Sequence, residues 1–204
     1  MSASADSSLV RPPIAALSWD DRRGSASMLW FIATEAMLFV ALFFAYFYLG
    51  ALNSQWPLDE PPKLLKASAM LLVLLTSSAV LWKAEQASKA GNTARARLWL
   101  GGTIVLGLVF IAIQVSEYRE HLRKLKPSAD AYASIFYTIT SFHALHLIVG
   151  LLMLSYVLFL PDLEGKEKPP HRPLHNAGLY WHFVDTVWVL VVALLYVLPN
   201  LHRS

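Results

Sequence analysis

Five long blocks of apolar residues, separated by short polar segments, constrain this chain more than any other feature. The apolar residues are gathered into these blocks instead of being spread at amphipathic spacing, and an α-helix of about 20 such residues crosses a bilayer. We therefore expect an all-α polytopic membrane protein, in which five transmembrane helices form one bundle. The expected spans are about 27–49, 64–82, 98–116, 131–160 and 179–198, so that residues 27–204 form the transmembrane domain and residues 1–26 a cytoplasmic tail.

The amino-acid composition excludes several classes of function for this chain. Apolar residues make up 56% of the chain and charged residues 15%, as a membrane bundle requires. There is no cysteine, which excludes disulfides and thiolate metal sites. The net charge of +3 is small and its basic residues are scattered, so the sequence does not indicate a nucleic-acid partner.

Prolines and aromatic residues mark the ends of the spans. Pro161 follows the fourth block, and Pro199 with Asn200 is expected to stop the fifth. Tryptophan and tyrosine favour the membrane–water interface. On this basis Trp19, Trp99 and Trp181 are interpreted as interfacial anchors.

Lysine and arginine predict the orientation. With the N-terminus in the cytoplasm the inner segments carry about ten of these residues and the outer segments about seven, which is the expected bias. Five spans also place the two termini on opposite sides, so we expect the C-terminus outside. The inner set is Arg11, Arg22, Arg23, Lys83, Lys89, Arg95, Arg97, Lys166, Lys168 and Arg172, and the outer set is Lys63, Lys66, Arg119, Arg123, Lys124, Lys126 and Arg203.

Ionisable residues inside four spans are the candidate functional groups, because such groups in hydrocarbon are costly without a partner or a task. Glu35 lies on the order of 12 Å below the inner surface, near the level of His146, so a contact between the two is geometrically allowed. His182 and Asp185 share a helix face at a shallower level. The remaining intramembrane polar residues are His143 in the fourth span and Gln114 with Glu117 at the outer end of the third.

These residues leave several chemistries open. Buried polar groups that hydrogen-bond between helices would fix the packing of the bundle. His143, His146 and His182 are candidate ligands of a metal or haem, although a haem needs axial ligands on opposing helices. A proton relay is a third reading, and a transporter with Glu35 as its coupling carboxylate is a fourth, against which the absence of paired repeats counts.

A further cluster is expected at the inner surface. Positive and aromatic side chains there are either an ordinary solvated loop or a site for the headgroup of an anionic lipid. The candidate headgroup residues are Arg22, Arg23, Arg172, His175 and Trp181.

Four ordered motifs resemble one known family, cytochrome c oxidase subunit III. Residues 180–188, Tyr-Trp-His-Phe-Val-Asp-Thr-Val-Trp, closely resemble its YWHFVDxVW signature. Residues 141–146 look like its GFHGxHV motif, with Ser141 and Ala144 in place of glycines, and residues 114–118 look like its QAxEY motif. Thr34-Glu35 with the aromatic run to Tyr48 looks like its SE…FFxAFY helix.

The resemblance implies a short, five-span bacterial form of subunit III in the inner membrane. It implies a subunit without its own redox centre that binds the catalytic subunit I and subunit II of a haem-copper terminal oxidase, where the haem and copper reside. In that family subunit III supports proton uptake during aerobic electron transport and protects the catalytic subunit, partly through bound phospholipid. Glu35 would match the family's carbodiimide-reactive carboxylate, with His146 as its partner. Subunit III of quinol oxidases and a protein associated with nitric oxide reductase belong to the same superfamily and remain alternatives.

Overall fold

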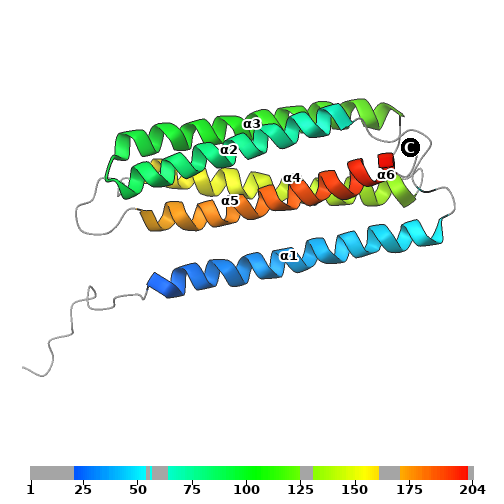
Figure 1. Ribbon diagram of the computed structural model, residues 1–204, viewed down its shortest axis with the longest axis horizontal. Coiled ribbons are helices and arrows are strands. Elements are labelled where there is room, and N and C mark those ends of the chain that lie inside the picture. The colour runs from blue at the N-terminus through cyan, green and yellow to red at the C-terminus, as the bar shows by residue number, and fades with distance from the viewer. Residues whose placement is uncertain (1–20, 54–55, 57–63, 125–130, 161–170, 202–204) are drawn as a thin grey trace, which may run out of the picture.

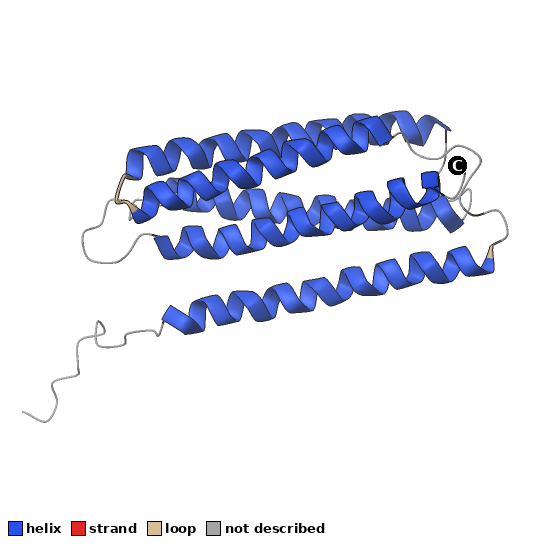
Figure 2. Ribbon diagram, viewed as in Figure 1, coloured by secondary structure: helices blue, strands red, loops and turns tan. Residues whose placement is uncertain are grey.

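The computed structural model describes residues 21–53, 56, 64–124, 131–160 and 171–201, and these residues are almost entirely helical (Figure 2). The long helices are α1 (Asp21–Leu52), α2 (Leu64–Lys89), α3 (Thr93–Lys124), α4 (Ala131–Phe159) and α5 (His171–Val191). A π-helical segment, η4 (Val192–Val197), and a short helix, α6 (Leu198–Leu201), continue α5. Five of the described helices are long and apolar enough to cross a membrane, which confirms the expected all-α polytopic bundle.

The helices are arranged in layers. Figure 1 shows α4 and α5 between α1 on one side and the pair α2 and α3 on the other. The first helix contacts α4 and α5, whereas α2 packs closely along α3 and also contacts α5. Much of the surface of α1 is therefore free of contacts with the other described residues.

A three-residue turn joins α2 to α3 and makes them antiparallel neighbours. Gly91 adopts a left-handed backbone conformation, with φ of 72°, that glycine tolerates best. The amides of Gly91 and Asn92 donate to the carbonyl oxygens of Ser88 and Ala87, which closes the end of α2 in a Schellman motif. The side chain of Asn92 then accepts from the amide of Arg95 at 3.1 Å and caps the start of α3.

Trp181 is the central packing residue of the bundle. Its ring is completely buried, and a Cβ added to Gly107 of α3 or Gly150 of α4 would lie 2.8 or 3.0 Å from it. The indole Nε1 donates to Ser77 Oγ of α2 at 3.0 Å. The interpretation of Trp181 as an interfacial anchor and headgroup residue is wrong, because a ring without exposed surface contacts neither water nor lipid headgroups.

Several helices are longer than the spans expected from the sequence. The first begins at Asp21 and the second continues to Lys89, because long polar side chains at a helix end can reach the interface while the backbone stays helical. Pro199 does not stop the fifth span, since α6 continues to Leu201. Proline is tolerated in the first turn of a helix, and the Asn200 side chain donates to the carbonyl oxygen of Tyr196 at 2.6 Å.

Candidate functional site

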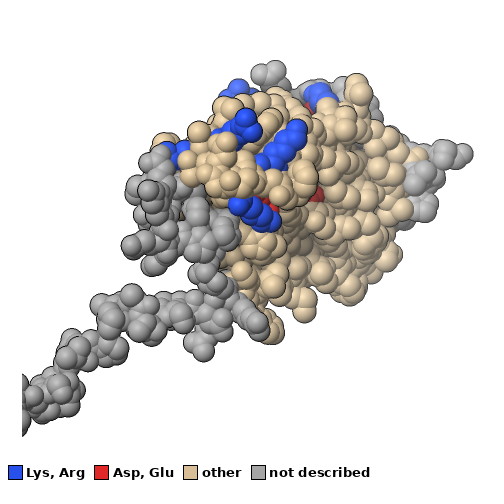
Figure 3. Space-filling view, turned by 60° about the vertical axis from the view of Figure 1, so that its left-hand side comes forward, with Lys and Arg blue, Asp and Glu red and all other residues tan. Residues whose placement is uncertain are grey.

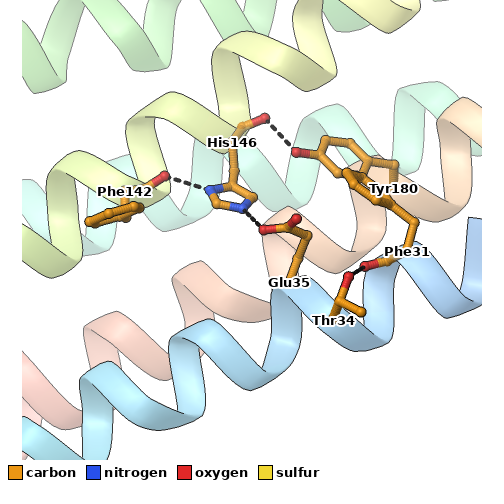
Figure 4. A network of polar contacts seen from close by, with 6 residues as sticks. All are labelled: Phe31, Thr34, Glu35, Phe142, His146 and Tyr180. Atoms are coloured by element: carbon orange, nitrogen blue, oxygen red, sulfur yellow. Dashed lines mark hydrogen bonds and ion pairs between the residues drawn. The ribbon is translucent and has the colours of Figure 1, made fainter.

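Glu35 of α1 and His146 of α4 meet in the bundle (Figure 4). The Glu35 Oε2 atom lies 2.9 Å from His146 Nε2. The other ring nitrogen, Nδ1, lies 2.7 Å from the backbone carbonyl oxygen of Phe142, one turn earlier in α4. The structure thus brings together the two residues that the sequence placed at a similar depth.

The hydrogen bonds of His146 determine how the pair is protonated. A carbonyl oxygen only accepts, so Nδ1 carries a hydrogen and donates it to Phe142. In the neutral imidazole Nε2 is then an acceptor, and a carboxylate facing it is an acceptor too. The contact with Glu35 therefore needs one shared proton, held by the carboxyl group or by Nε2. In either form the pair has no net charge, which suits a site within the membrane.

Aromatic rings enclose the pair. The Phe39 ring lies edge-on to His146 with centroids 5.0 Å apart, and the Phe183 ring lies 6.4 Å away. The Tyr180 hydroxyl donates to the carbonyl oxygen of His146 at 3.3 Å, and its ring stacks on Phe31 at 6.0 Å. Side chains of α1, α4 and α5 thus meet here. The His146 side chain is 9% exposed and that of Glu35 is 27% exposed, so Glu35 forms the open edge of the site.

His143 lies in a different environment from His146, although the two are only one turn apart. Its ring is fully buried, 4.8 Å from the ring of Trp188 and 5.8 Å from that of Phe110. Neither ring nitrogen has a hydrogen-bond partner within the described residues. The two imidazoles therefore do not form one ligand set, and aromatic rings occupy the space beside His143 that a haem would need.

His182 and Asp185 of α5 meet α2 through one serine. The Ser78 hydroxyl lies 2.7 Å from His182 Nδ1 and donates to Asp185 Oδ2. Asp185 is 5% exposed. This group lies at the contact of α5 with α2, apart from the contact of Glu35 with α4.

Gln114 and Glu117 lie toward the opposite end of the bundle. Both are buried, and Glu117 Oε1 forms an ion pair of 2.6 Å with Lys66 Nζ near the start of α2. One residue on, the Tyr118 hydroxyl donates to Thr140 Oγ1 at 2.7 Å. The polar side chains at this end join α2, α3 and α4.

The candidate headgroup residues lie where α1 and α5 begin. Arg22 and Arg23 are in the first turn of α1 and Arg172 is in the first turn of α5, but their side chains lie outside the described set. Ser25 of α1 donates to Asn176 of α5 at 3.3 Å, so the two helix starts are neighbours. Figure 3 shows Lys and Arg side chains gathered at this end of the bundle, where the exposed ones include Lys83, Lys89 and Arg95.

The described residues contain no group of three or more His, Cys, Asp or Glu side chains arranged to hold a metal ion. The polar side chains instead pair across helix contacts, at Glu35 with His146 and at Lys66 with Glu117. The arrangement can hold or move protons and can fix the positions of the helices.

Several residues of these sites do not stand out in the sequence. Ser77 and Ser78 bond to Trp181 and to Asp185, respectively, yet a serine in an apolar helix is too common to stand out. Glu85 falls beyond the expected end of the second span, although its side chain is only 13% exposed. Three adjacent hydroxyl residues, Thr76, Ser77 and Ser78, in the middle of an apolar block are the one signal that the sequence offers for this contact.

Comparison with known proteins gives a consistent result. The model of the family described as cytochrome c oxidase subunit III matches residues 22–199. This match includes part or all of each of the five described membrane spans and confirms the resemblance seen in the four motifs.

Individual relatives carry the name of the same family. A protein named cytochrome c oxidase subunit 3 from Synechocystis sp. is 34% identical over 171 residues, which cover 82% of this chain and 72% of that protein. A protein of the same name from Thermostichus vulcanus is 32% identical, with 85% of this chain and 86% of that protein covered. Another from Bacillus sp. PS3 is 30% identical, with 82% of both chains covered.

Proposed function

Because the chain belongs to the cytochrome c oxidase subunit III family, we propose that it is a subunit without its own redox centre that stabilises the catalytic subunit of the oxidase. Family membership implies assembly into a cytochrome c oxidase complex of the respiratory chain. The proposed partners are subunits I and II, which hold the haem and copper. The proposed task is to protect subunit I during turnover and to support its proton uptake.

The contact between Glu35 and His146 carries this proposal. It joins α1, which among the described helices contacts α4 and α5, to the rest of the bundle through a neutral hydrogen-bonded pair. Polar side chains that hydrogen-bond between helices hold membrane helices in one arrangement. A subunit that supports another protein needs such a fixed shape. The aromatic rings of Phe39 and Phe183 pack around His146 and help to fix its position.

Replacement of Glu35 in the assembled complex tests the proposal. In Glu35→Ala the Nε2 atom of His146 loses its hydrogen-bond partner, so we expect poorer assembly and fewer turnovers before inactivation, with a near-normal initial rate of oxygen consumption. In Glu35→Gln the side-chain amide can donate to Nε2, so we expect behaviour closer to that of the unmodified complex. Val40→Ala, at a 59% exposed position of α1, is the matched control.

An immediate and complete loss of electron transfer in Glu35→Ala, in a complex that still contains this chain, would contradict the proposal. That outcome would mean that the chain takes part in the redox chemistry itself. Haem, iron or copper bound in stoichiometric amount to the isolated chain would support the alternative in which histidines ligate a redox group. The relatives compared above are named as cytochrome c oxidase subunits, which favours that complex over a quinol oxidase or a nitric oxide reductase.

We also propose that the chain lies in a bacterial inner membrane with its N-terminus in the cytoplasm. The cluster of Lys and Arg where α2 turns into α3 supports this orientation, since positive residues favour the cytoplasmic side (Figure 3). Arg22, Arg23 and Arg172 at the same end, with His175 beside them, are the proposed residues for an anionic phospholipid headgroup.

A further inference from the structure

A row of polar side chains along the contact of α2 with α5 takes no part in the pairing of Glu35 with His146. We propose that this row is a proton relay that reversibly loads one proton onto Asp185 from the end of the bundle where α5 begins. The ligand of the site is a proton. The inference goes beyond the proposed function and does not rest on it, because the row lies at a different helix contact.

At the buried end of the relay, three side chains form a continuous set of hydrogen bonds. The Ser78 hydroxyl has one hydrogen, which it donates to Asp185 Oδ2. Its oxygen can at the same time accept from His182 Nδ1, which lies 2.7 Å away. The order is therefore imidazole, hydroxyl and carboxylate, each within hydrogen-bond distance of the next.

The other end of the relay, where α5 begins, reaches the surface of the protein. His175, Gly178, His182 and Asp185 follow one another on the same face of α5, about one turn apart. The Glu85 carboxylate from α2 lies directly against Gly178, in space that a Cβ would fill. His175 Nδ1 lies 3.9 Å from Glu85 Oε1, and its side chain is 46% exposed.

The two ends of the row differ in burial. The His175 side chain is 46% exposed and that of Glu85 is 13% exposed, His182 and Ser78 are partly exposed, and Asp185 is buried. Gly178 is the positioning residue, because it lets the Glu85 carboxylate approach α5 one turn before His182. Polar side chains thus follow one another along this helix contact, from His175 and Glu85 at the exposed end to Asp185 at the buried end.

Asp185 is suited to end the route. Within the described residues its Oδ1 atom is buried and has no hydrogen-bond partner. A buried carboxylate without full hydrogen bonding is costly, and uptake of a proton removes its charge. The titratable residues of the other helices packed against α5 contact other side chains: Glu35 and His146 lie beside Tyr180 and Phe183, and His143 lies against Trp188.

The transfer balances in one proton. His182 takes up on Nε2 a proton that comes from solvent at the exposed end of the row, while its Nδ1 hydrogen passes to Ser78 Oγ and the hydroxyl hydrogen of Ser78 passes to Asp185 Oδ2. The carboxylate becomes a neutral carboxylic acid, His182 ends neutral with its hydrogen on Nε2, and Ser78 is again a hydroxyl. The same steps in reverse release the proton.

Infrared difference spectroscopy on the assembled complex tests the relay. The C=O stretching bands of protonated carboxyl groups are followed during a pH titration and after rapid mixing with D2O. We expect one pH-dependent band that Asp185→Asn removes and Glu35→Gln leaves in place. In Ser78→Ala the band should remain but exchange its hydrogen about tenfold more slowly, because one relay hydrogen bond is missing. Ser78→Thr keeps the hydroxyl and should exchange at the unmodified rate.

A pair of glycine variants gives a second, independent comparison. Gly178→Ala should slow the exchange because the new methyl group displaces Glu85, whereas Gly101→Ala meets nothing within 4 Å and should not. No pH-dependent band from Asp185, or unmodified exchange in Ser78→Ala, would overturn the proposal. If Ser78→Ala fails to assemble, equal exchange in the two glycine variants overturns it. None of these outcomes affects the proposed stabilising role, which depends on Glu35 and His146.

Discussion

The indole of Trp181 fills space that two glycines on neighbouring helices leave open. Gly107 faces both this ring and Leu151, and Gly150 faces the ring from α4. In a membrane the helices gain little from hydrophobic burial, so close contact through small residues supplies much of the packing energy. The sequence showed that Trp181 and Gly107 are present, but not that they meet, because that contact depends on how three helices are rotated.

We predict that Gly107→Ala destabilises the protein and that Gly101→Ala does not. A Cβ at Gly107 would lie 2.7 Å from Leu151 and 2.8 Å from Trp181, whereas one at Gly101 meets nothing within 4 Å. Overpacking of this kind costs about 1–3 kcal/mol. The free energies of unfolding of the two variants, measured in detergent mixtures, check this. Equal stability of the two variants would show that the slot around Trp181 is not tight.

The motif positions were predictable from sequence, but their partners were predictable only in part. The depth of Glu35 and His146 allowed their contact, and the structure has it. His143 and His146 are three residues apart, a spacing that places two side chains on neighbouring positions of a helix, yet one imidazole lies between aromatic rings and the other bonds to α1. Helix rotation, which a single sequence does not specify, separates these two environments.

The turn between α2 and α3 determines where α2 ends and where α3 begins. Apolar content alone placed the end of the second span near residue 82, but the helix continues to Lys89 and stops where Gly91 adopts a positive φ. Hydropathy reports which part of a helix lies in hydrocarbon. The capping residues Gly91 and Asn92 report where the backbone stops being helical.

We predict that Gly91→Ala weakens the α2–α3 hairpin. An alanine in the left-handed region costs about 1–2 kcal/mol relative to glycine, and no side chain lies within 4 Å of the added methyl group to offset the cost. The free energy of unfolding should fall by that amount, and Gly101→Ala again serves as the control. An unchanged free energy in Gly91→Ala would mean that the turn readily adopts another conformation.

As a whole, the bundle is an inner group of four helices with α1 attached at one side (Figure 1). The all-α class and the five spans were predictable because apolar blocks of sufficient length leave few alternatives. The sequence did not predict that α1 is packed less closely than the other described spans, because the first apolar block resembles the other blocks in composition. The exposed positions of α1, such as Val40 and Phe44, are available to lipid or to another subunit.

We predict that the pair of Glu35 and His146 keeps α1 at a fixed distance from α3. The chain has no cysteine, so spin labels can be introduced at Val40→Cys and Leu108→Cys, which are 59% and 55% exposed. Addition of Glu35→Ala should broaden the distance distribution between these labels. A label pair at Leu108→Cys and Leu152→Cys, on α3 and α4, should not change. If the distance distribution between the labels on α1 and α3 is the same with and without Glu35→Ala, aromatic packing alone positions α1.

Removal of this chain from the purified oxidase and its later return measures the central claim most directly. Oxygen consumption is recorded from the first turnover to inactivation, and haem, iron and copper are quantified in the separated chain and in the remaining complex. We expect the complex without the chain to keep its metals and most of its initial rate, to fail after fewer turnovers, and to recover when the chain is restored. Loss of electron transfer from the first turnover, together with haem or metal in the separated chain, would contradict the account.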